Sequence, residues 1–345
     1  MLIDLKGVMA LATLSSSLIK ISALCNNNIS RHRTLTGHIP LPYYVNRRRS
    51  SSVAARSSVN VDDPSLLSNN HNEYEWLKQS RPMRIYARSL NGGGGLNNIP
   101  VDSSSVTTKK VVHFQRHGQG THNELYKQFT DEMGEPPDLA ETDPKKNPLL
   151  LEHIIDAPLT QKGKDQCAAQ RYVASKLDGV ELIICSPLVR TLQTAHITFE
   201  NHLDCKNVKW IAHEGVREEF GTLLCNKRRP LSETRVQFPK VDYTYMPQEQ
   251  HDEEDDILWN KYVEENSNND GIPKREDLVD ISHRAYHFLV TFLLERPEKE
   301  IVVVGHSHWF HAMTNGVLDV GDDTSMTAMF GQAELKSFEL VFTKQ

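Results

Sequence analysis

The sequence predicts an α/β domain, in which a mostly parallel central sheet is flanked by helices on both faces to form a three-layer sandwich. Short apolar runs that end in polar residues alternate with stretches whose apolar residues recur at helical spacing. The runs LIIC and VVVG are apolar at consecutive positions. Such runs are typical of parallel strands that are covered by helices on both sides.

The predicted elements alternate from residue 110 onward. Strands are predicted where Val, Ile and aromatic residues are dense, and helices where apolar residues recur with a period near 3.6. The expected strands are 110–115, 180–185, 209–212, 300–304 and 335–342, and the expected helices are 164–177, 188–199, 276–295 and 308–318. The last strand alternates apolar and polar residues, so we expect it at an edge of the sheet.

Two less regular segments, 119–160 and 213–262, interrupt this alternation. We expect them to cross the carboxyl end of the sheet and to form a lid or a specificity wall. The second segment contains an acidic run at 251–256. Metal binding is conceivable there, but such a run is usually a solvated surface.

The first 108 residues differ from the rest in composition. Residues 1–60 are rich in Ser and Arg and contain one acidic residue, Asp4. This is the composition of an organellar transit peptide, and a disordered leader is the alternative. We expect the chloroplast rather than the mitochondrion, with the cytoplasm as the alternative. Residues 61–108 include Gly92–Gly95 and are predicted to be a linker of low order, so the folded catalytic domain is expected over 109–345.

The composition of the whole chain argues against several classes of partner. A formal net charge of -6 argues against a nucleic-acid binder. No stretch resembles a membrane span of about 20 apolar residues. The five cysteines form neither a CxxC pair nor a zinc-ligand spacing. We therefore expect no nucleic-acid or membrane partner, and neither a metal nor a cofactor.

Three of the predicted strands end in polar sequence, RHG, SPLVR and GHSH, and together these offer Arg116, His117, Arg190 and His306. In sheets of this type, ligands bind beyond the carboxyl ends of the strands. Arginine suits bidentate recognition of phosphate oxygens, and histidine can act as a nucleophile or, when protonated, as an oxyanion ligand. The strand ends therefore predict a pocket for a phosphoryl group.

The motifs VVHFQRHGQGTHN, LIICSPLVRTLQTA and VVVGHSHWFHAMTN resemble those of the histidine phosphatase superfamily, also called phosphoglycerate mutase-like. The match spans about 109–342 in the family's order, and DAPLTQKGKDQ is similar to a further family segment. Within the family, VREEFGTLLCNKRRP looks most similar to plant phosphoglycerate mutase-like proteins. The resemblance implies carbohydrate metabolism and a small phosphorylated substrate.

The resemblance also implies roles for single residues. His117 matches the nucleophile that becomes phosphorylated, and Arg116, Arg190 and His306 match the phosphate pocket. Asn123 matches a polar position that often contacts the phosphoryl group. For the proton donor the match indicates Glu218, with Glu219 as the alternative, because Glu218 stands three steps before Gly221 where most mutase-type members have four.

The expected activity is metal-independent hydrolysis of a phosphomonoester through a phosphohistidine. A mutase-type phosphotransferase and a non-catalytic protein that binds a phosphorylated ligand are the alternatives. Mutases of the family typically show Trp residues in and after the first motif, whereas Gln119–Leu125 contains none. Lys227, Arg228 and Arg229 could bind a second anionic group of the substrate, or could form a solvated basic loop.

Overall fold

The computed structural model describes residues 71–91, 105–203, 208–246, 255–269 and 271–344. The predicted transit peptide or leader at 1–60 lies outside these residues. Within them, eight strands form one sheet in the order β5-β4-β3-β6-β2-β8-β1-β7. The strands are β1 (Met83–Ser89), β2 (Val106–Arg116), β3 (Leu182–Cys185), β4 (Lys209–Ala212), β5 (Val241–Asp242), β6 (Glu300–Gly305), β7 (Leu318–Asp319) and β8 (Leu335–Lys344).

All neighbouring strands in this sheet run parallel except at β8, which is antiparallel to both β2 and β1. The sheet is therefore mostly parallel, as predicted. The consecutive apolar residues of β6 explain why helices cover both faces. Ile301 and Val303 pack into the cluster that includes helices α8 (Leu278–His287) and α9 (Ser307–Gly316), whereas Val302 and Val304 pack on the opposite side.

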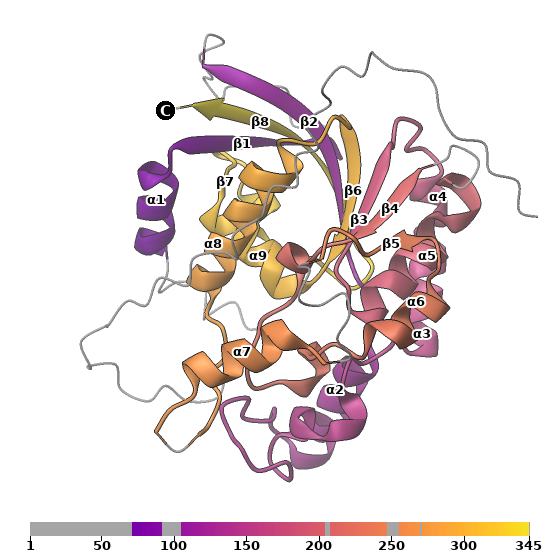
Figure 1. Ribbon diagram of the computed structural model, residues 1–345, viewed down its shortest axis with the longest axis vertical. Coiled ribbons are helices and arrows are strands. Elements are labelled where there is room, and N and C mark those ends of the chain that lie inside the picture. The colour runs from indigo at the N-terminus through magenta and orange to yellow at the C-terminus, as the bar shows by residue number, and fades with distance from the viewer. Residues whose placement is uncertain (1–70, 92–104, 204–207, 247–254, 270, 345) are drawn as a thin grey trace, which may run out of the picture. The chain divides into compact units, whose positions relative to one another are not determined.

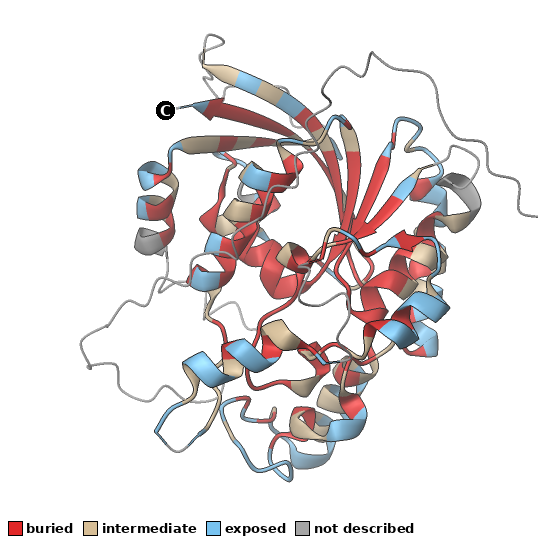
Figure 2. Cartoon of the chain, viewed as in Figure 1, coloured by how far each residue is buried: buried red, intermediate tan, exposed pale blue. Residues whose placement is uncertain are grey.

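The helices form the two outer layers of the predicted three-layer sandwich (Figure 1). The π-helical turn η8 continues α8 on one face, and α3 to α6 cover the other face; the buried residues concentrate between these layers (Figure 2). The remaining helices are α1 (His71–Ser80), α2 (Thr121–Met133), α3 (Gln161–Ala169), α4 (Arg171–Ala174), α5 (Val189–Leu203), α6 (Leu231–Gln237) and α7 (Ile257–Asn266), and η8 spans Phe288–Leu293. Single 3₁₀ turns are η2 (Pro148–Leu150), η3 (Glu152–Ile154), η5 (Glu214–Val216), η6 (Leu224–Asn226) and η9 (Thr324–Thr327). None of the helices in the described ranges is long and apolar enough to cross a membrane.

The linker predicted at 61–108 is wrong for residues 71–89, which form α1 and β1. All seven residues of β1 pair with β8, so β8 lies inside the sheet and not at its edge. Only Ile85 and Ala87 of β1 are buried, and this low apolar content explains why the sequence pattern missed the strand. The charges of β1 are paired instead, for example between Arg84 and Asp319 at 2.8 Å.

We expect a chain that begins at His71 to fold and a chain that begins at Lys109 to fail. The shorter chain would lose β1 and would expose the pairing edge of β8. It would also lose Arg81, which donates to the carbonyl of Gly316 at the end of α9 (2.6 Å). Solubility and cooperative thermal unfolding followed by circular dichroism test this. A chain of 109–345 that unfolds with the same midpoint as the longer chain would contradict it.

Candidate active site

The three polar strand ends meet at one edge of the sheet, as predicted. Because β3, β6 and β2 are parallel neighbours, their carboxyl ends lie side by side. The ring centroids of His117 and His306 are 5.2 Å apart. A cavity of about 370 Å³ opens at this edge, and Arg116, His117 and Arg190 contribute to its walls. His306 is fully buried beside His117 and does not line the cavity.

The irregular segments form the other walls of this cavity, as expected for excursions over the end of the sheet. Segment 119–160 contributes mainly α2 residues, and segment 213–262 contributes Glu218, Glu219, Leu223, Cys225 and Asn226. The full lining is Arg116, His117, Gln119, His122, Asn123, Tyr126, Lys127, Thr130, Asp131, Leu149, Lys162, Arg190, Glu218, Glu219, Leu223, Cys225, Asn226, Ser307, His308 and Gln332.

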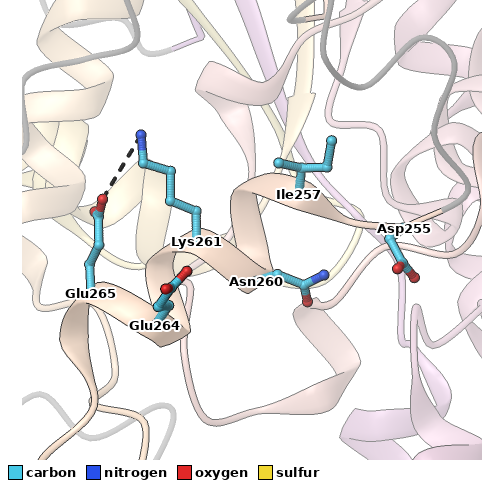
Figure 3. A pocket seen from close by; sticks show the side chains of 6 residues that line it. All are labelled: Asp255, Ile257, Asn260, Lys261, Glu264 and Glu265. Atoms are coloured by element: carbon cyan, nitrogen blue, oxygen red, sulfur yellow. Dashed lines mark ion pairs between the residues drawn. The ribbon is translucent and has the colours of Figure 1, made fainter.

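A second pocket runs along α7 and is unsuited to an anion. Its lining includes three carboxylates, those of Asp255, Glu264 and Glu265 (Figure 3). Its one cationic side chain, Lys261, lies 3.9 Å from the Glu265 carboxylate. This pocket, of about 510 Å³, lacks the arginine and histidine groups that a phosphoryl group requires.

His117 has the tautomer and the neutral ring that a nucleophilic histidine requires. Its Nδ1 lies 2.6 Å from the carbonyl oxygen of Gly118, which can only accept, so Nδ1 carries the proton. The lone pair of the neutral ring is therefore on Nε2. Burial lowers the pKa of His117 well below its ordinary value, and the charges of Arg190, His122 and Arg116 add to the effect. The imidazole is thus neutral and competent to attack phosphorus.

The loop Gly118–Gln119, which follows His117, packs directly against α3. A Cβ atom added at Gly118 would collide with the carbonyl oxygen of Gly163, and one added at Gly163 would collide with that of Gln119. Thr160 caps α3 and donates to the Gln119 side chain at 2.9 Å. The segment DAPLTQKG therefore serves to support the loop that carries His117.

Two buried arginines place positive charge at the cavity. Arg116 donates through Nη1 to the carbonyl of Phe330 at 2.6 Å. Arg190 donates to the Cys225 carbonyl at 2.7 Å and to the Asn226 side-chain oxygen at 2.8 Å. Its Nε is buried without a hydrogen-bond partner in the part of the chain that the structure describes. Both contacts of Arg190 are to neutral acceptors, so its charge remains available to an anion.

His306 is neutral in this site rather than protonated as an oxyanion ligand would be. Burial lowers the pKa of His306 well below its ordinary value, and the charge of Arg190 lowers it further. Its Nε2 lies 2.8 Å from the hydroxyl oxygen of Ser186, and its Nδ1 has no hydrogen-bond partner among the described residues. A bound phosphoryl dianion would offset the positive field of Arg190 and favour the protonated ring.

The two candidate acids lie in different environments. Glu218 accepts from the backbone N–H groups of Trp309 (3.2 Å) and His308 (3.4 Å), at the start of α9. Both oxygens of Glu219 accept from Arg275, at 2.7 and 2.8 Å. Burial would raise the pKa of Glu219, but Arg275 and His308 outweigh it and the pKa lies below its ordinary value. Glu219 is therefore fixed as a carboxylate, and the geometry favours Glu218 as the acid.

Asn123 lines the cavity, and its side-chain oxygen accepts from the N–H of Gly120 at 3.0 Å. Its contact with a phosphoryl group stays a prediction. The sequence also suggests that His122 and His308 could line the pocket, and both do. The ring of His122 lies 5.6 Å from that of His117. The sequence did not single out Asn226, which contacts Arg190.

The predicted second anion site at Lys227, Arg228 and Arg229 does not line the cavity. Arg228 is buried and its Nε lies 3.8 Å from Glu214, while Arg229 donates to the Ile155 carbonyl. These two arginines are structural. The expectation that the acidic run at 251–256 is a solvated surface is wrong for Asp256, which is 1% exposed and caps α7. Residues 251–254 lie outside the described residues.

Buried histidines give the fold a predictable pH dependence. Burial lowers the pKa values of His117, His122 and His306 well below 6.5, and that of His213 to about 3. Below pH 6.5 the unfolded chain binds protons that the folded chain does not, so the free energy of unfolding falls as pH decreases. We expect the thermal midpoint to drop between pH 7 and pH 5. The drop should be smaller in His117→Asn, and an unchanged midpoint would contradict the assignment.

Comparisons with known proteins agree with this site. The family model for the histidine phosphatase superfamily (branch 1) matches residues 140–250. A phosphoglycerate mutase-like protein of Arabidopsis thaliana is 27% identical over 262 residues, which cover 67% of this chain and 84% of that protein. A second Arabidopsis protein, phosphoglycerate mutase-like protein 1, is 28% identical over 264 residues, which cover 67% of this chain and 81% of that protein. A probable phosphatase of Schizosaccharomyces pombe is 26% identical over 57% of this chain and 74% of its own. The resemblance predicted from the motifs is confirmed.

Proposed function

We propose that this chain, which is similar to proteins of the histidine phosphatase superfamily, hydrolyses a small phosphomonoester through a phosphohistidine at His117. One observation carries the proposal. The hydrogen bond from Nδ1 of His117 to the Gly118 carbonyl leaves the Nε2 lone pair for attack, in a cavity that two buried arginines line. Such a site favours a phosphoryl group and supplies a nucleophile for it.

The reaction has two steps. In the first, Nε2 of His117 attacks phosphorus, the phosphorus–oxygen ester bond breaks, and Glu218 gives its proton to the leaving oxygen. In the second, the Glu218 carboxylate takes a proton from water, the water oxygen attacks phosphorus, and the phosphorus–nitrogen bond breaks. Arg116 and Arg190, which line the cavity, stabilise the charge on the equatorial oxygens in both steps. Inorganic phosphate leaves, and Glu218 is protonated again.

A panel of phosphorylated metabolites and p-nitrophenyl phosphate tests the proposal, with His117→Ala as the control. We expect release of inorganic phosphate from at least one of them, at a rate that a chelator does not change. Interconversion of 2- and 3-phosphoglycerate without phosphate release would identify a mutase instead. No turnover by a folded protein would favour a protein that only binds phosphorylated ligands.

The role of Glu218 is tested by the dependence on the leaving group. General acid catalysis contributes about 10²–10⁴-fold, and it matters most when the leaving oxygen is strongly basic. We expect Glu218→Gln to lower kcat/KM for an alkyl phosphate by about that factor, and to lower it much less for p-nitrophenyl phosphate. Glu219→Gln is the matched control and should affect both substrates equally. The opposite pattern between the two variants would assign the acid to Glu219.

A further inference from the structure

Cys225 and Asn226 form the wall of the cavity beside Arg190, and the proposed mechanism does not use them. We propose that Asn226 is a positioning residue that aims the guanidinium of Arg190 at the phosphoryl group, and that the buried pair Arg217–Asp256 holds Asn226 in place. This inference rests on the proposed function, because it assigns a role within the same phosphate site.

The contacts of Arg190 fix the plane of its guanidinium. One Nη donates to the Cys225 carbonyl at 2.7 Å, and the other donates to the side-chain oxygen of Asn226 at 2.8 Å. A guanidinium is planar, so fixing both terminal nitrogens sets the direction of the whole group. Asn226 is 4% exposed and lines the cavity, so this contact lies at the site itself.

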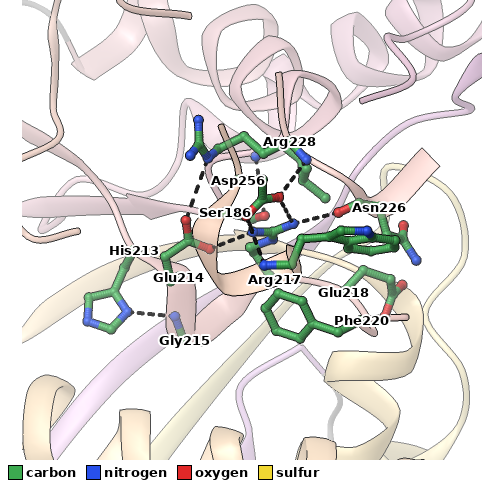
Figure 4. A network of polar contacts seen from close by, with 12 residues as sticks. Ser186, His213, Glu214, Gly215, Arg217, Glu218, Phe220, Asn226, Arg228 and Asp256 are labelled. Atoms are coloured by element: carbon green, nitrogen blue, oxygen red, sulfur yellow. Dashed lines mark hydrogen bonds and ion pairs between the residues drawn. The ribbon is translucent and has the colours of Figure 1, made fainter. Parts of the chain in front are cut away.

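A second layer of contacts fixes Asn226 in turn (Figure 4). The backbone carbonyl of Asn226 accepts from Arg217 at 2.6 Å. Two residues further on, the N–H of Arg228 donates to Asp256 at 2.8 Å. Arg217 and Asp256 are themselves joined by two hydrogen bonds, at 2.7 and 3.0 Å. The backbone is therefore anchored at Asn226 itself and again two residues further along the chain.

This network balances its own charge. The guanidiniums of Arg217 and Arg228 lie among the carboxylates of Glu214 and Asp256, and all four residues are buried. Displacing any one of these four groups would leave an opposite charge buried without its partner, so the network resists rearrangement. The network can therefore hold Asn226 rigidly without placing an uncompensated charge near the cavity.

The choice of a neutral amide at position 226 has a chemical consequence. A carboxylate would hold the guanidinium of Arg190 equally well but would cancel its charge and repel a phosphoryl dianion. An amide oxygen and a backbone carbonyl orient the guanidinium and leave its positive charge for the substrate. Asn226→Ala would remove the orienting contact alone, whereas Asn226→Asp would keep an acceptor oxygen but add a negative charge. The two substitutions should therefore weaken phosphate binding to different extents.

Binding of inorganic phosphate, measured by isothermal titration calorimetry, tests the inference. A hydrogen bond to a charged group corresponds to about 10- to 100-fold in affinity, so we expect Asn226→Ala to weaken phosphate binding by about 10-fold. Asn226→Asp keeps the acceptor oxygen and should weaken it further, by about 100-fold, because of the added charge. Asn260→Ala, at an exposed position of α7, is the matched control and should bind like the parent protein.

A double-variant cycle separates positioning from general destabilisation. Lysine carries a compact charge with no planar group to orient, so in an Arg190→Lys background we expect Asn226→Ala to change phosphate affinity by less than about 2-fold. An equal loss in both backgrounds, or no loss in either, would overturn the inference. If Asn226→Ala does not fold, Asn226→Asp, which keeps the shape of the side chain, decides: unchanged phosphate affinity would overturn the inference as well.

Phosphate binding does not require turnover, so the two proposals can fail separately. A parent protein that binds phosphate but hydrolyses no ester would refute the hydrolase proposal and leave the role of Asn226 standing. A parent protein that hydrolyses esters while Asn226→Ala retains full phosphate affinity and kcat/KM would refute only the role of Asn226. A parent protein that does not bind inorganic phosphate at all would overturn the inference.

Discussion

Replacement of His117 by alanine is expected to lower the rate of phosphomonoester hydrolysis by about 10³–10⁶-fold, the range seen when a catalytic nucleophile is removed. Alanine offers no lone pair to phosphorus, whereas Arg116 and Arg190 would still bind the phosphoryl group. We therefore expect kcat to fall far more than KM rises. The measurement is steady-state hydrolysis of p-nitrophenyl phosphate. The control is His153→Ala, a substitution of an exposed histidine, which should hydrolyse this substrate at the rate of the parent protein.

The covalent intermediate gives a second measurement of the same prediction. Rapid denaturation during turnover of a ³²P-labelled substrate should trap an acid-labile phosphoryl group on the parent protein and on His153→Ala. The label should be absent from His117→Ala. A label that persists in His117→Ala, or a rate near that of the parent protein, would show that another group attacks phosphorus. His122 would be the first alternative to test, because its ring lies 5.6 Å from that of His117.

The parts of the fold that could be predicted are those whose burial is visible in a short window of sequence. The strands β3 and β6 are buried on both faces, so their consecutive apolar residues mark them unambiguously. β1 buries only Ile85 and Ala87 and neutralises its arginines by pairs with Asp319 and Glu339. Its place in the sheet depends on partners more than 200 residues away in the chain, which no local pattern contains.

The same distinction applies to the site. Arg116, His117 and His306 stand directly at strand ends, and Arg190 lies in the first turn of the helix after β3, so the alternation of elements was sufficient to bring them together. Asn226 was missed because its role depends on a three-dimensional contact with Arg190. Asp256 was misjudged because it ends a run of acidic residues, and a charge run usually indicates a solvated surface. Only the position of Arg217 shows that this one carboxylate is a buried partner.

Asp256 also carries the largest expected effect on stability. Burial would raise its pKa, but Arg217 and Arg228 outweigh that effect, so Asp256 is charged in the folded protein. Asp256→Ala would remove one of the two carboxylates that Arg217 contacts among the described residues, and would also remove the acceptor of the Arg228 N–H. Removing one partner of a buried ion pair costs about 3–5 kcal/mol, because the other charge stays buried without compensation.

That cost corresponds to a fall of about 10 °C in the midpoint of thermal unfolding. The matched control is Asp255→Ala, since Asp255 precedes Asp256 in the chain but is exposed, and its midpoint should stay within about 2 °C of the parent protein. Asp256→Asn keeps the shape without the charge and separates packing from electrostatics. Equal midpoints for Asp255→Ala and Asp256→Ala would show that the Arg217–Asp256 pair does not stabilise the fold, and the anchoring of Asn226 would then have to come from the backbone of Cys225–Arg228 alone.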